Sequence, residues 1–155
     1  MRKILVLILL LTVSASCNQQ KNYLILAEDA DFRQGYLNQN GDTVIPFGKY
    51  EMCFTDTIKT FGIVLDKTSN FVAIDKNENV LFEVFKYDNG PDYFSEGLIR
   101  IVKNGKIGYA NEQGKIVIKP QYDCAWPFAN GKASVSNNCK VAKEGEHLVW
   151  TSENW

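Results

Sequence analysis

Short apolar runs alternate with polar turns along this chain, and the alternation returns three times at nearly constant spacing. Similar segments begin at Gln34, Phe71 and Ile107, so the copies start 37 and then 36 residues apart (34 to 71, 71 to 107). Runs of strand length between turn residues are typical of an all-β chain, and long helical periodicity is absent. A repeat of this length predicts an open array of antiparallel β-meanders, with a propeller-like arrangement as the alternative.

The repeats also predict the domain boundaries, and we expect one β-repeat domain over residues 23–155. Its parts in order are a first short strand, three copies and an atypical C-terminal segment: 23–27, 34–70, 71–106, 107–139 and 140–155. Terminal repeats are often atypical because they cap an apolar face. The last segment, with an expected closing strand over 146–150, is either such a cap or a truncated fourth repeat.

Alternation within the apolar runs predicts which side chains are buried. Ile99 and Ile101 point to one face of a strand and Arg100 to the other, which predicts a buried face and a solvent-exposed face. Asn104 and Gly105 stand between two such runs, and both residues tolerate positive φ. They therefore predict a two-residue hairpin turn.

Aromatic residues fall into a recurring and a non-recurring set. Tyr50, Tyr87 and Tyr122 return at the repeat spacing, which favours a place in the core over a ligand-binding face. The three tryptophans do not recur, so we expect them to be the candidates for contact with a ligand or partner: Trp126, Trp150 and Trp155.

The N-terminal residues predict an export signal. Two basic residues precede an apolar run over 4–11, which is too short to span a bilayer and is typical of a secretory signal. Ser-Ala-Ser-Cys, ending at Cys17, resembles a bacterial lipobox. We therefore expect a lipoprotein signal peptide over 1–16, lipidation of Cys17 and a polar tether over 17–22. Ordinary signal cleavage that leaves Cys17 unmodified is the alternative.

From this export signal we expect the protein in the bacterial cell envelope, attached to a membrane by its N-terminal lipid. The outer membrane is the expected location, and the periplasmic or surface side stays open. Disulfides persist in such compartments. Cys124 and Cys139 flank one predicted strand and would close a loop of about 15 residues, with Cys53 left free. Three unpaired, buried thiols are the alternative.

Composition and motif content argue against several function classes. The formal charge of −1 comes without a basic stripe, so no nucleic acid partner is expected. No Cys-x-x-Cys pair exists and His147 is the only histidine, so neither metal nor cofactor is expected. His147 has no accompanying nucleophile motif, and we assign no catalytic residues. The segment 75–79 resembles the opening of a calcium loop but fits a hairpin turn better.

Carboxylates that could serve glycoside hydrolysis are better explained as solvated loop residues. These are Glu28, Asp29, Asp31, Asp88 and Asp92.

The third copy carries the most specific pattern in the chain. It reads Gly-Tyr-x-Asn-x-x-Gly-Lys-Ile-Val-Ile-x-Pro-x-Tyr-Asp over 108–123, followed by Pro-Phe at 127–128. This pattern resembles the bacterial WG-repeat family over residues 34–136, although the tryptophan of the Trp-Gly pair is replaced in every copy. The resemblance implies a repeat array without assigned catalytic residues, and many such proteins are exported or lipid-anchored.

These observations favour a non-catalytic protein-interaction module whose partner is another envelope protein. The alternative is a carbohydrate-binding accessory protein in which Trp126, Trp150 and nearby tyrosines stack against sugars. The sequence does not identify a small-molecule ligand.

Overall fold

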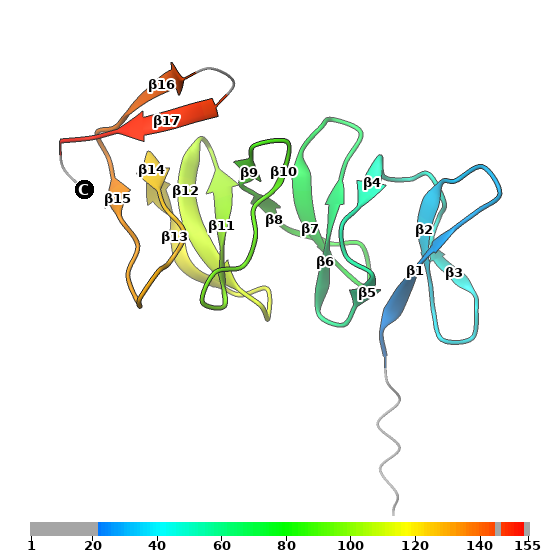
Figure 1. The fold of residues 1–155 in the computed structure, drawn as a ribbon. Coiled ribbons are helices and arrows are strands. Elements are labelled where there is room, and N and C mark those ends of the chain that lie inside the picture. Colours follow the sequence, from blue (N-terminus) through cyan, green and yellow to red (C-terminus); the bar gives the residue numbers. More distant parts are fainter. Residues whose placement is uncertain (1–21, 145–146, 154–155) are drawn as a thin grey trace, which may run out of the picture.

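The computed structural model describes residues 22–144 and 147–153. The predicted signal peptide, Cys17, nearly all of the tether and Trp155 lie outside the described residues. Within them the chain forms seventeen short strands and no helix, so no helix there is long and apolar enough to cross a membrane. The strands run as an elongated array from the N-terminal to the C-terminal end (Figure 1).

The building unit is a meander of three antiparallel strands, and it occurs three times. The units are β1 (Leu24–Glu28), β2 (Gln34–Leu37) and β3 (Thr43–Ile45); β6 (Phe61–Leu65), β7 (Phe71–Asp75) and β8 (Val80–Val84); and β11 (Leu98–Lys103), β12 (Lys106–Asn111) and β13 (Ile116–Tyr122). Each unit begins one strand earlier than the predicted copies, because β1 pairs with β2 as β6 pairs with β7.

Shorter strands connect the units and close the array. They are β4 (Met52–Cys53), β5 (Thr57–Ile58), β9 (Lys86–Tyr87), β10 (Gly90–Pro91), β14 (Cys124–Ala125), β15 (Val135–Ser136), β16 (Lys140–Glu144) and β17 (His147–Thr151). A four-stranded sheet has the order β3-β2-β1-β5, and a seven-stranded sheet has the order β13-β12-β11-β8-β7-β6-β4. These sheets are open, which confirms the predicted all-β repeat array.

Apolar cores lie between neighbouring units. Alternate residues of β6 and β7 contribute to two different cores: Val64 and Val72 pack toward the first unit, while Ile63 and Ala73 pack toward the third. Central strands are therefore covered on both faces, as in other stacked repeat proteins. The predicted division into one buried and one solvent-exposed face is wrong for these strands.

The core tyrosines are Tyr36 and Tyr109, which are equivalent residues of β2 and β12. Each is almost completely buried, and each hydroxyl donates to a backbone carbonyl at 2.7 Å. The residues predicted to fill this role behave differently: Tyr87 is exposed, and Tyr50 and Tyr122 are half-buried. The recurrence is real, but Tyr50 and Tyr122 pack against the edges of the cores rather than inside them, and Tyr87 is exposed.

Two glycines are required by close backbone crossing. A Cβ on Gly35 would lie 2.7 Å from the Ile45 carbonyl oxygen, and one on Gly108 would lie 2.5 Å from the Pro120 nitrogen. At the equivalent position of the second unit, Val72 pairs in register with Glu83, and the partner strand does not cross so closely. The predicted hairpin at Asn104 forms, with positive φ at both turn residues.

Candidate functional site

Arg100 is the residue that departs most from its repeat. On β11 it pairs with Tyr109, as Ile63 on β6 pairs with Ala73 and as Leu26 on β1 pairs with Tyr36. Two of the three equivalent positions are thus aliphatic. The Arg100 side chain is nevertheless only 2% exposed. Its predicted place on a solvent-exposed face is wrong, because segments from both sides of β11 in the sequence cover the side chain, with contacts from Phe85 and Ala125.

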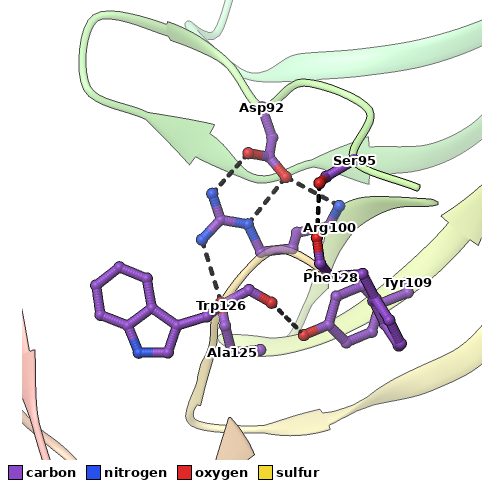
Figure 2. Close-up of polar contacts among 7 residues, drawn as sticks. All are labelled: Asp92, Ser95, Arg100, Tyr109, Ala125, Trp126 and Phe128. Carbon is purple, nitrogen blue, oxygen red and sulfur yellow. Dashed lines mark hydrogen bonds and ion pairs between the residues drawn. The ribbon is translucent and has the colours of Figure 1, made fainter. Parts of the chain in front are cut away.

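Asp92 is the partner that makes this burial possible (Figure 2). Its carboxylate accepts from the Arg100 Nε at 2.9 Å, the Nη2 at 2.6 Å and the backbone N–H at 3.0 Å. A fourth bond runs from Nη1 to the Ala125 carbonyl at 3.1 Å. Asp92 is itself buried, so its predicted place in a solvated loop is also wrong. A pair with this many charge-assisted bonds meets the condition for burying two charges.

The second unit shows the neutral form of the same connection. There the Thr55 hydroxyl oxygen accepts from the Ile63 N–H at 3.0 Å, across the same separation of eight residues. Thr55 and Asp92 therefore play the same part: each side chain accepts a hydrogen bond from the backbone of the first strand of the unit that follows it. In the third unit an ion pair replaces a hydroxyl and an aliphatic side chain, which indicates that the fold itself does not require the charges.

Aromatic side chains surround the Arg100 guanidinium and continue away from it. The guanidinium carbon lies 4.4 Å from the ring centroid of Phe85, 5.5 Å from that of Tyr87 and 6.0 Å from that of Trp150. Trp150 contacts Phe85 and Trp126 edge to face, both at 5.5 Å between centroids, and Tyr87 contacts Tyr93 at 5.7 Å. We call these five residues the aromatic strip: Phe85, Tyr87, Tyr93, Trp126 and Trp150.

Three members of the aromatic strip reach the surface: Tyr93 is 52% exposed, Tyr87 48% and Trp126 40%. Cation–π contact with Arg100 holds the inner rings in place. The surface therefore offers rigid aromatic groups above a fixed positive charge. Tyr, Trp and Arg are the residues enriched at the energetic centres of protein interfaces.

Sequence reasoning placed Trp126 among the non-recurring residues, and the strand pairing corrects this. The backbone N–H of Trp126 donates to the Ser134 backbone carbonyl. In the same way, the backbone N–H of Phe54 donates to the Ile63 carbonyl and that of Phe85 to the Arg100 carbonyl. An aromatic residue therefore stands at this position after every unit. Different loop lengths between the units hid the match, and the backbone hydrogen bonds reveal it.

The C-terminal hairpin of β16 and β17 supplies Trp150. A disulfide between Cys124 and Cys139 ties the chain just before this hairpin to β14, while Cys53 is free and buried. The Ser152 hydroxyl adds hydrogen bonds to Ser136 and to the Asn138 carbonyl. The structure thus brings Trp126 and Trp150 together, as a shared contact surface requires.

The other sequence candidates are not members of the aromatic strip. His147 begins β17, and segment 75–79 is a turn in which the Asp75 carboxylate accepts from two backbone N–H groups. Asp29 is paired with Arg33, whose hydrogen bond lowers the pKa of that carboxyl. Among residues 22–144 and 147–153, no group of three or more His, Cys, Asp or Glu side chains is placed to hold a metal ion.

Comparison with known protein families identifies a repeat family. Residues 73–106 and 107–140 each match the protein family described as the WG containing repeat. These ranges correspond closely to the second and third predicted copies. No curated protein and no solved structure matches the chain.

Proposed function

Because the chain is a WG-repeat protein, we propose that it serves as a non-catalytic interaction module, anchored by lipid at Cys17 in the cell envelope. The observation that carries the proposal is the aromatic strip. The Arg100–Asp92 ion pair stands where the second unit has a neutral hydrogen bond. The buried guanidinium contacts rings of the aromatic strip, and three rings of the strip are exposed.

The expected partner is an envelope protein that contacts the exposed rings. Tyr87 and Tyr93 supply large contact area at small cost in conformational entropy, since each has only two side-chain torsions. Their neighbour Arg100 already has its hydrogen bonds satisfied inside the protein. Binding therefore depends on burial of the rings and not on a new ion pair with Arg100.

The proposal is tested by quantitative pull-down from detergent-solubilised membranes of cells that produce the protein. The bait is the mature protein, either wild type or with Tyr87→Ser and Tyr93→Ser. The control bait carries Val80→Ser, which changes an exposed aliphatic residue of β8 outside the aromatic strip. We expect one protein to be recovered in near-equal amount by wild type and control, and at least tenfold less by the double variant. Equal recovery by all three baits contradicts the proposal.

Carbohydrate binding is the second candidate, favoured by the exposure of the Tyr93 and Trp126 rings. Aromatic faces of this kind can stack against sugar rings. Titration of tryptophan fluorescence with glycans isolated from the same envelope tests this function. A saturable change that Trp126→Ala removes supports it, and an unchanged spectrum across the glycans rejects it.

The predicted anchor is tested separately. Cys17→Ser should release the protein from the membrane fraction and abolish incorporation of radiolabelled fatty acid. An unchanged distribution contradicts lipidation without affecting the evidence for the aromatic strip.

A further inference from the structure

The loop between β1 and β2 presents an aromatic residue that the fold does not explain. Phe32 is 84% exposed, and its φ is 59°. A bulky side chain in the left-handed region is strained, and large exposed apolar groups are unfavourable in water. The loop lies at the opposite end of the array from the C-terminal hairpin (Figure 1), far from the aromatic strip.

The loop holds Phe32 in a fixed place. The Asp29 Oδ1 accepts from the N–H groups of Asp31 and Arg33, both at 3.0 Å, and its Oδ2 accepts from the Arg33 Nε at 2.8 Å. The Phe32 N–H itself donates to the Asp29 carbonyl at 3.1 Å. The exposed Phe32 ring is therefore carried by a turn whose backbone is held by hydrogen bonds.

The second unit contains the same turn without an aromatic residue. Between β6 and β7, Asp66 accepts from the N–H groups of Thr68 and Asn70 at 2.8 and 2.9 Å. Ser69 occupies the position of Phe32 and has a φ of 65°. The turn thus requires a left-handed residue, and a small polar one satisfies it. Phe32 carries two unfavourable features that the turn does not need.

The charges around Phe32 indicate what it contacts. Glu28, Asp29 and Asp31 stand beside a single cation, Arg33, and the Asp31 side chain is 75% exposed. Such a surface is repelled by anionic lipid headgroups and attracted to basic side chains. We propose that Phe32 is an anchor residue that inserts into an apolar pocket, rimmed by basic side chains, on a partner protein. This contact is independent of the aromatic strip.

Stability measurements separate a binding role from a structural one. Phe32→Ser copies the second unit and should leave the urea midpoint unchanged or raise it, whereas the matched variant Ser69→Phe should lower it. A residue that stabilised the fold would behave in the opposite way. A lower midpoint for Phe32→Ser therefore overturns the proposal.

Photocrosslinking tests the contact itself. A benzophenone side chain placed at position 30, which is exposed in the same loop, should form one protein adduct in intact cells. The adduct should fall at least tenfold with Phe32→Ser and with Asp31→Arg, and should be unaffected by Tyr93→Ser. Its loss with Tyr93→Ser would assign it to the aromatic strip and overturn this proposal. No adduct, or an adduct indifferent to Phe32→Ser, also overturns it.

Vesicle binding is the remaining control. Mature protein without its lipid should show no Phe32-dependent binding to vesicles of phosphatidylethanolamine and phosphatidylglycerol. Binding that Phe32→Ser abolishes would identify a membrane contact in place of a protein pocket, and would overturn the proposal.

Discussion

Exchange of the buried ion pair for its neutral counterpart tests the repeat relationship directly. The variants are Asp92→Thr, Arg100→Ile and the combination of both, which gives the third unit the residues Thr55 and Ile63 of the second. Each single change leaves one buried charge without its partner. The double change removes both charges and restores the hydroxyl-to-backbone bond that the second unit already contains.

The expected magnitudes follow from burial. Asp92 and Arg100 side chains are 1% and 2% exposed, and removing one member of such a pair costs about 3–5 kcal/mol. Replacing the whole pair by apolar or neutral groups is often neutral or stabilising. The cation–π contacts of Arg100 with the aromatic strip are lost as well, at about 1–2 kcal/mol. The double variant should therefore lie within about 2 kcal/mol of the wild type.

Urea unfolding followed by far-UV circular dichroism is the assay. With a slope of about 2 kcal/mol per molar urea, each single variant should unfold about 2 M earlier, and the double variant should regain most of that shift. Single variants that cost less than about 1 kcal/mol would refute the burial argument. A double variant whose loss equals the sum of the single losses would show that Asp92 and Arg100 do not interact.

Three further predictions test other parts of the structure. Gly108→Ala places a Cβ 2.5 Å from a backbone nitrogen and should cost more than about 2 kcal/mol in urea unfolding, while Gly90→Ala, with open space around it, should be nearly neutral. Cys139→Ser opens a loop of 15 residues; a loss of about 3 kcal/mol and weaker near-UV dichroism from Trp150 are expected, and an unchanged spectrum would contradict the role of the disulfide. Burial raises the pKa of Tyr109 to about 12. Because the folded state then keeps a proton that the unfolded state loses, stability should fall between pH 10 and 12, and Tyr109→Phe should flatten this fall.

Much of the fold was predictable because residues close together in the sequence determine the strands and turns of each repeat. Turn residues such as Asn104 and Gly105, and apolar runs at offsets of 37 and 36 residues, determine strands and hairpins locally. The extra first strand β1 was recognised as a strand but not as part of a unit. Its equivalence to β6 and β11 rests on which strands pair across each hairpin, and the copies had been aligned from the second strand of each unit.

The candidate site was predictable only in part. Trp126 and Trp150 were named together as candidates, and the structure places their rings in contact, although Trp126 was wrongly taken as non-recurring. Their role in binding stays a prediction. Arg100 and Asp92 were missed because alternation assigns a charged residue to solvent unless its partner is known. One signal was available: Arg100 occupies a position where the earlier copies have Leu26 and Ile63.

The central claim is that the aromatic strip is where this repeat array meets its partner. Hydrogen–deuterium exchange of the mature protein, with and without the partner recovered by pull-down, tests it most directly. We expect slower exchange in segments 85–93, 124–126 and 147–151, which carry the aromatic strip. Slower exchange confined to the turns at 38–42, 75–79 and 111–115, with no change in those three segments, would contradict the claim.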